Sequence, residues 1–171
     1  MKTKRWLGRG VVVLWIVALI TVPVAWAQEY LFSLDRNISR VIINQDGSAD
    51  IEYWLTYTCA AGAHPIDIVD VGMPNDTYQL STAQAWFSAG TGEGEEVPLS
   101  DIRDSEFVQP GVEIHLDQYT LQPGEQGTIH LRINVERMVY PDTEDESYAS
   151  VEFAPHYYDE ANVVGDTYME I

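Results

Sequence analysis

The clearest pattern in the chain is a strict alternation of apolar and polar residues over positions 49–58. A period of two residues is typical of a β-strand that buries one face. Asp46-Gly47 comes just before this stretch, and Asp-Gly is a strong signal for a two-residue type I′ turn, because both central residues of that turn need a positive φ. The sequence therefore predicts a hairpin over residues 38–58, in which Ile42 lies opposite Ile51.

A second alternating pair of segments flanks a proline–glycine turn. The apolar positions are Val112, Ile114 and Leu116 before the turn and Ile129, Leu131, Ile133 and Val135 after it. Residues 122–125 read Gln-Pro-Gly-Glu, which is typical of a type II turn. Pairing about this turn places Leu116 opposite Leu131 and, on the polar face, Asp117 opposite His130. The sequence thus predicts a second hairpin, with polar residues such as Glu113 facing solvent.

Further strands are expected at residues 30–35, 66–71, 79–87, 149–153 and 166–171. Clusters of glycine, proline and acidic residues separate them, and no segment has convincing helical periodicity. About eight or nine short antiparallel strands predict an all-β fold, an antiparallel β-sandwich. We expect its core to contain Ile42, Ile51, Tyr53, Leu55, Ile114, Leu116, Leu131 and Ile133.

The first 27 residues follow a different pattern. A basic start at residues 2–9 precedes an almost unbroken apolar run at 11–24, and Ala25-Trp26-Ala27 offers small residues at a cleavage site. These are the parts of a secretory signal peptide. We therefore expect a leader at 1–27 and a single β-sandwich domain at 28–171, secreted or held at the cell envelope.

Two alternatives stay open for the ends of the chain. Residues 11–27 reach the lower length limit for crossing a bilayer, so the leader could remain as a membrane anchor. The final residues, 167–171, still alternate like a strand, which fits a fragment of a longer membrane protein as well as a complete domain. We favour cleavage after Ala27, because Pro23 interrupts the apolar run shortly before the small residues.

The charge of the chain excludes several functions. Both lysines and two arginines lie in the leader, which leaves five arginines against 27 acidic residues and a formal charge of −22 on the expected mature domain. Phosphate backbones need clustered lysine or arginine, so nucleic acid is not an expected partner. Anionic lipid headgroups are disfavoured for the same reason. The only cysteine, Cys59, has no partner for an intramolecular disulfide, and a small buried side chain is its simplest interpretation.

An acidic run supplies the candidate metal ligands. Asp142, Glu144 and Glu146 alternate as do the first ligands of a calcium loop. Ser147 replaces the loop glycine, and Phe153 occupies the place of the final glutamate, which excludes a helix-loop-helix calcium site. The alternatives are an irregular calcium site and a solvated acidic loop, and no other cofactor is expected.

The predicted polar faces carry two further candidates. His115, Asp117 and His130 would share one face, where two imidazoles and a carboxylate could hold zinc or copper. Arg132 opposite His115 would repel a metal, so a cross-strand charge ladder on a solvent face is the favoured alternative. Trp54 lies on the polar side of its strand, where it could stack on a sugar or a protein partner. The sequence has no Gly-x-Ser-x-Gly, His-Glu-x-x-His or Cys-x-x-Cys motif.

The leader, followed by Asp46-Gly47-Ser48 and an alternating strand with Glu52, resembles the start of a family of bacterial predicted membrane proteins. Those proteins carry an N-terminal extracytoplasmic β-sandwich of unknown function, so the resemblance implies a location and a fold and no catalytic residues. We therefore expect an exported, non-enzymatic domain that acts in binding or assembly at the cell envelope, with a protein or glycan partner. The alternatives are a calcium-dependent adhesive or carbohydrate-binding module and, behind it, an extracytoplasmic hydrolase. Ligand identity and oligomeric state stay open.

Overall fold

The computed structural model describes residues 31–145, 147–154 and 163–171, which have the predicted all-β fold. The strands are β1 (Phe32–Ile43), β2 (Ala49–Cys59), β3 (Ile68–Gly72), β4 (Tyr78–Ala89), β5 (Val97–Leu99), β6 (Ile102–Asp104), β7 (Gly111–His115), β8 (Gln126–Val135), β9 (Val139–Pro141), β10 (Ala149–Val151) and β11 (Val163–Glu170), with a short 3-10 helix, η1 (Asp117–Tyr119), before β8. Within these residues no helix is both long and apolar enough to cross a membrane. The expected leader lies outside the described part of the chain.

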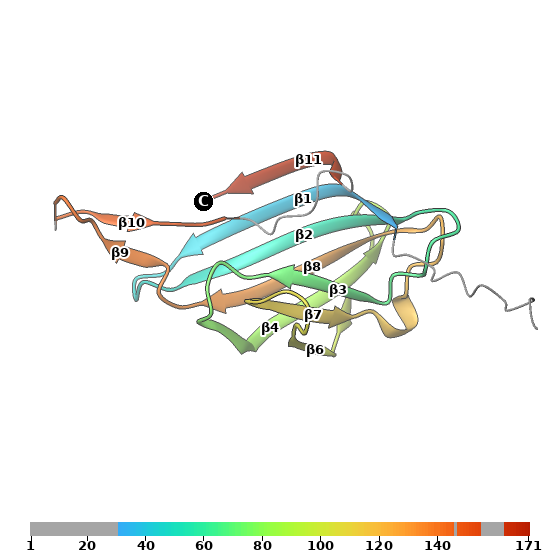
Figure 1. Cartoon of the computed structure of the whole chain (residues 1–171), viewed down its shortest axis with the longest axis horizontal. Coiled ribbons are helices and arrows are strands. Elements are labelled where there is room, and N and C mark those ends of the chain that lie inside the picture. The colour runs from blue at the N-terminus through green and yellow to red at the C-terminus, as the bar shows by residue number, and fades with distance from the viewer. Residues whose placement is uncertain (1–30, 146, 155–162) are drawn as a thin grey trace, which may run out of the picture.

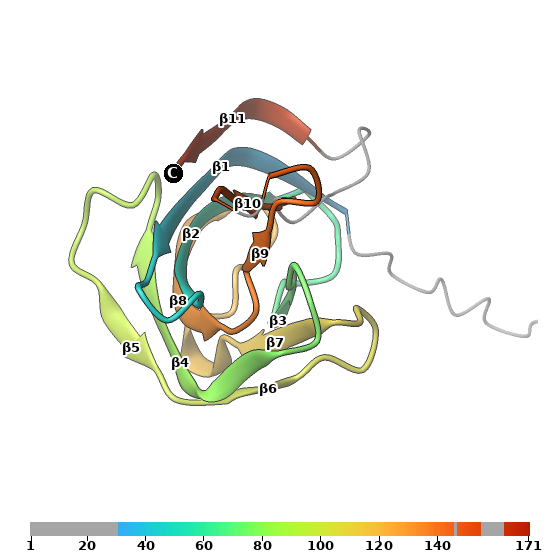
Figure 2. The ribbon, with the colours of Figure 1, turned by 90° about the vertical axis from the view of Figure 1, so that its left-hand side faces the viewer.

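The strands form three sheets. The largest has six strands in the order β11-β1-β2-β8-β4-β5, and it curves around a three-stranded sheet in the order β3-β7-β6 (Figures 1 and 2). All neighbouring strands are antiparallel except β1 and β11, which run parallel. A two-stranded hairpin of β9 and β10 projects from one end of the molecule (Figure 1). The result is a sandwich-like all-β domain with one large and one small layer.

One apolar core joins the two layers. Strands β2 and β8 contribute the alternating residues Ile51, Tyr53, Leu55, Ile129, Leu131 and Ile133, and β7 with the residue after it contributes Val112, Ile114 and Leu116. All of these side chains are fully buried. The predicted core is thus confirmed at seven positions, because the period-two pattern of each strand identifies its buried face. The exception is Ile42, which is 43% exposed.

The exposure of Ile42 follows from the length of the β1–β2 loop. Asn44 N–H donates to Ser48 O (2.9 Å) and Gly47 N–H donates to Asn44 O (3.1 Å), which closes a three-residue loop. Gly47 has φ +85°, whereas Asp46 lacks the positive φ that a type I′ turn requires. The predicted two-residue turn is therefore wrong, and the register shifts by one residue. Val41 now lies opposite Ile51, and Ile42 turns to the outer face.

The second predicted hairpin does not form. Strand β7 pairs with β3 and β6, whereas β8 pairs with β2 and β4. The predicted β-turn itself is present, because Glu125 N–H donates to Gln122 O (2.8 Å) and Gly124 has φ +89°. It leads from η1 into β8 rather than joining β7 to β8. The two strands belong to different sheets and meet in the core, which explains why both apolar patterns were right and their pairing was wrong.

Glu113 also differs from the prediction. It lies on β7, the central strand of the small sheet, and is only 8% exposed. Its carboxylate accepts a hydrogen bond from His115 Nε2 at 2.9 Å, and Arg103 is its neighbour on β6. The hydrogen bond with His115 lowers the pKa of Glu113, against the opposing effect of burial. The residue is therefore part of a covered polar pair rather than a solvent-facing side chain.

Candidate functional site

The outer face of the six-stranded sheet carries a row of aromatic side chains. Trp54 on β2 lies opposite His130 on β8, which in turn lies opposite Trp86 on β4. The Trp54 and His130 rings stack with centroids 4.5 Å apart, and the His130 and Trp86 rings stack at 4.8 Å. The guanidinium carbon of Arg40, on β1, lies 5.3 Å from the centre of the Trp54 ring. We call Arg40, Trp54, His130 and Trp86 the aromatic row.

The geometry of the row follows from the sheet. Neighbouring strands lie about 4.8 Å apart, so paired aromatic residues stack at that spacing and their rings stand on edge to the sheet. His130 is covered on both faces by tryptophans. Trp54 has His130 on the side of β8 and Arg40 on the side of β1. Within the row, only Trp86 has a ring face that no other member of the row covers. This face is on the side of β5, where Trp86 pairs with Pro98.

Ion pairs border the row. Arg40 pairs with Glu52 (3.4 Å) and with Glu170 on β11 (3.1 Å). Arg132 pairs with Asp50 at 3.0 Å. Pairs of this kind on a solvated face contribute little stability, but they fix the position of the charges around the tryptophans. The stacked rings of the row therefore form an aromatic centre, and Arg40 and the other charged residues form a rim of both charge signs around it.

Hydrogen bonds extend this rim toward β5 and β8. His130 Nδ1 lies 3.1 Å from Glu96 Oε1, in the segment before β5. Asn134 Nδ2 donates to Asp50 Oδ1 at 2.8 Å. That hydrogen bond lowers the pKa of Asp50, and Arg132 lowers it further, so the carboxylate stays ionised beside the row.

The predicted histidine cluster does not assemble. His115 lies opposite Ile68 in the small sheet, whereas His130 belongs to the aromatic row. Asp117 lies in η1, and Arg132 is paired with Asp50 rather than with His115. The hypothesis of a zinc or copper site on a shared face was wrong, since it depended on the β7–β8 pairing that the fold does not contain.

The acidic run lies between β9 and β10. The Asp142 carboxylate accepts backbone N–H bonds from Glu144 (2.8 Å) and Asp145 (3.0 Å), which lower its pKa. Glu146 lies outside the described residues. Among those that are described, no three or more His, Cys, Asp or Glu side chains form a group that could hold a metal ion. Calcium binding by Asp142, Glu144 and Glu146 stays a prediction.

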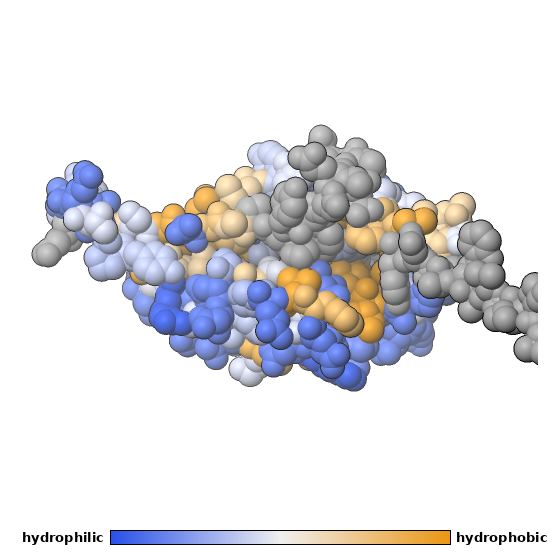
Figure 3. All heavy atoms as spheres, in the orientation of Figure 1, coloured by the Kyte–Doolittle hydropathy of each residue, from blue (hydrophilic) through white to orange (hydrophobic). Residues whose placement is uncertain are grey.

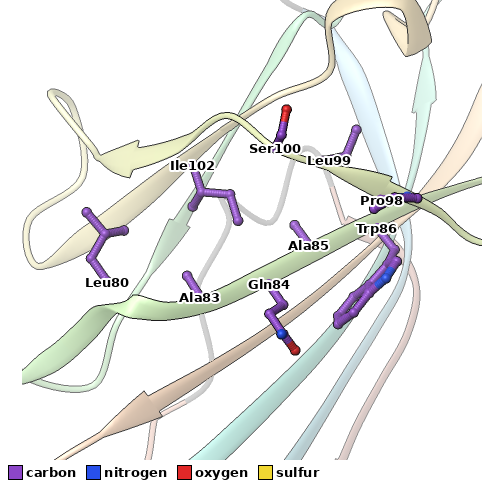
Figure 4. A pocket seen from close by; sticks show the side chains of 9 residues that line it. All are labelled: Leu80, Ala83, Gln84, Ala85, Trp86, Pro98, Leu99, Ser100 and Ile102. Atoms are coloured by element: carbon purple, nitrogen blue, oxygen red, sulfur yellow. The ribbon is translucent and has the colours of Figure 1, made fainter.

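A groove of about 500 Å³ opens beside the row, at the edge of β4. Strand β5 pairs with β4 only at residues 85–87, and the chain then crosses to β6 in the other sheet. Leu80, Ala85 and Ile102 point into the gap, while Gln84 and Trp86 point to the other side of β4 (Figure 4). Among the described residues that line this groove, none is acidic or basic, so those residues offer no groups for acid–base catalysis.

The sequence placed Trp54 and His130 on polar faces but assigned them to different candidate sites, and it did not single out Trp86 or Arg40. Trp54 was placed correctly on the polar side of its strand. His130 and Trp86 also occupy outward positions in alternating segments, which was the available signal. Their meeting depends on the strand order β2-β8-β4, and that order was hidden by the incorrect pairing of β8 with β7. Cys59 is buried as expected, with burial raising the pKa of its thiol.

Comparison with known proteins identifies no family. No family model matches the chain, and no curated protein matches it. Among solved structures, it is similar to an M1 zinc metallopeptidase from Deinococcus radiodurans, with 17% identity and a TM-score of 0.40 over 64% of this chain and 21% of that chain. A two-domain mutant form of an M1 zinc metallopeptidase, bound to L-tryptophan, is similar to it with 17% identity and a TM-score of 0.39. That match covers 66% of this chain and 22% of the peptidase chain. The chain spans about a fifth of these peptidases, and a likeness at this level carries no functional argument.

Proposed function

We propose that the chain is an exported, non-enzymatic binding domain of the cell envelope and that the aromatic row is its recognition surface. The observation that carries the proposal is the stack of Trp54, His130 and Trp86, partly exposed on the outer face of the large sheet. Tryptophan and arginine are the residues that most often dominate binding energy at protein interfaces. Stacking fixes the ring orientations before binding, which reduces the entropy lost in a complex.

The ring orientation favours a protein partner over a glycan. A sugar stacks on an aromatic face, and in this row only Trp86 keeps a face free of the other members. A protein can use the ring edges together with the ion pairs of Arg40 and Arg132 on the rim. A glycan-binding module is the second candidate, with Trp86 as its stacking residue.

The test compares binding of the full chain, expressed with its own leader, to envelopes of the cells that produce it. Trp54→Ala and Trp86→Ala should each weaken binding by at least about tenfold, as expected for aromatic anchors that a partner covers in the complex. Tyr148→Ala is the matched control, since it removes an exposed aromatic residue from the β9–β10 hairpin. Unchanged binding by both tryptophan variants would contradict the proposal.

Two further measurements separate the alternatives. Loss of binding after protease treatment of the envelopes supports a protein partner, whereas loss only after enzymatic removal of glycans promotes the second candidate. N-terminal sequencing of the recovered protein tests export. Cleavage gives a chain that starts at Gln28, and an intact start at Met1 in the membrane fraction indicates an anchor.

A further inference from the structure

The loop between β6 and β7 displays the most exposed large apolar residue of the described chain. Phe107 is 84% exposed at the tip of residues 105–110. Single exposed apolar residues are common on soluble proteins and need no explanation by themselves. What distinguishes Phe107 is the number of interactions that hold the surrounding backbone in place.

Ser105 fixes the backbone beneath the phenylalanine. Its side chain is buried, and its Oγ accepts N–H bonds from Phe107 (3.1 Å) and Val108 (2.8 Å). The same hydroxyl donates to Asp70 Oδ1 on β3. Ser105 N–H also donates to Gly111 O at 2.9 Å, which closes the loop. The one donor and two acceptor sites of the Ser105 hydroxyl are thus all used in and around the segment that carries Phe107.

The other end of the loop is held as closely. Met73 N–H donates to Pro110 O at 2.9 Å, so the loop is tied to the end of β3. A Cβ at Gly111 would lie 2.5 Å from Val108 O and 3.0 Å from Val71 O, which leaves no room for a side chain. The close approach therefore requires glycine at this position. The loop is a fixed frame whose apolar tip points away from the core.

The charges beside the tip are acidic. Asp104 comes just before the loop, Glu106 lies within it, and both are exposed. Tyr78 OH donates to Asp104 Oδ1 at 2.7 Å, which orients that carboxylate. The nearest cation along the chain, Arg103, is engaged with Asp101 at 2.6 Å. A surface that carries Lys or Arg complements this arrangement, whereas anionic lipid headgroups would be repelled.

We propose that Phe107 is the anchor of a second docking site and inserts into an apolar pocket, rimmed by lysine or arginine, on a protein partner. A rigid loop loses little entropy when it binds, and a buried phenylalanine supplies enough apolar area for a strong anchor. The loop joins two strands of the small sheet, whereas the aromatic row lies on the outer face of the large sheet (Figure 2). The surface over β3 and β7 combines apolar and hydrophilic residues (Figure 3). The domain can therefore contact one partner through the aromatic row and another through this loop.

The experiment measures binding of the full chain to native envelopes at several salt concentrations. Phe107→Ala should weaken binding at least about tenfold, while Phe107→Leu, which keeps an apolar tip, should stay within about threefold of the unaltered chain. Tyr148→Ala, another exposed aromatic residue, should also stay within about threefold. The double variant Asp104→Asn, Glu106→Gln should reduce the salt dependence of binding, because it removes the charges that attract the basic rim.

A photoreactive phenylalanine at position 107 and vesicles of phosphatidylcholine complete the test. The proposal is supported when the photoreactive chain forms a covalent adduct with a protein and the salt effect is also seen. An excess of the unaltered chain should prevent this adduct, whereas an excess of the Phe107→Ala chain should not. Three outcomes overturn it: Phe107→Ala binds like the unaltered chain, binding persists on protein-free vesicles and depends on Phe107, or Phe107→Ala lowers the melting temperature by several degrees, which would give the ring a structural role. The tryptophan variants report separately on the aromatic row.

Discussion

At the scale of single residues, one extra loop residue decides which side chains of β1 are buried. Alternation identifies two possible faces of a strand, and the turn determines which of them meets the core. Val41 is buried and Ile42 is 43% exposed because the loop closes at Asn44 and Ser48. Residue character alone did not distinguish them, since both are β-branched and apolar.

Truncation of core and surface isoleucines should therefore differ. Ile133→Ala should lower the free energy of unfolding by about 2–5 kcal/mol, because its fully buried side chain leaves a cavity on β8. Ile42→Ala should cost less than about 1 kcal/mol, since much of its side chain is already in contact with water. Urea denaturation of both variants checks this expectation, and equal losses would contradict the shifted register.

Asp35 should make stability depend on pH. Burial tends to raise its pKa, but hydrogen bonds from Thr58, Ser33 and Gln126 outweigh that effect and lower it. The pKa of an aspartate in an unfolded chain is about 3.9. A carboxyl group whose pKa is lower in the folded protein stabilises the fold at pH values above the unfolded pKa, and this stabilisation is lost as the pH falls through the folded pKa. Asp35→Asn should lower the free energy of unfolding at pH 7. On acidification below pH 4, this variant should lose less stability than the unaltered chain. Denaturation at pH 7 and pH 3 measures both changes, and parallel losses in the two chains would count against this role.

At the scale of elements, local patterns predicted the strands and turns better than their partners. Strand β2 and the Gln122–Glu125 turn were identified because each depends on neighbouring residues only. The pairing of β8 with β2 and β4 depends on residues far away in sequence, and the candidate surface was missed for that reason. Strands β5, β6 and β9 have three residues each, too few for a period of two to be recognised.

The three-residue loop between β1 and β2 gives a direct test at this scale. Gly47→Ala should destabilise the fold by about 1–2 kcal/mol, because φ is +85° there and an L-residue with a side chain is strained in that region. Gln45→Ala is the control in the same loop, since its side chain is exposed and its φ is not positive. Thermal unfolding of both variants measures the difference. Equal stability would show that the loop can change its conformation without cost.

At the scale of the whole molecule, basic residues are concentrated where the proposed recognition surface lies. Arg36, Arg40 and Arg132 all belong to the outer face of the large sheet. The other two described arginines pair with nearby acids, Arg103 with Asp101 and Arg137 with Asp76. Elsewhere the acidic residues have few cationic partners, so repulsion among them opposes the compact state and cations should relieve it.

Cations should act on this repulsion mainly by screening. A defined calcium site saturates at low calcium concentration, whereas screening responds equally to sodium at matched ionic strength. We expect screening, because the Asp142 carboxylate is engaged in hydrogen bonds to its own loop and the acidic run lacks the glycine and final glutamate of a calcium loop. Melting curves with calcium and with sodium at equal ionic strength should therefore coincide, and the double variant Asp142→Asn, Glu144→Gln should melt in the same way in both salts. A rise specific to calcium that this variant abolishes would instead establish the acidic loop as a metal site and make a calcium-dependent adhesive module the better account of the domain.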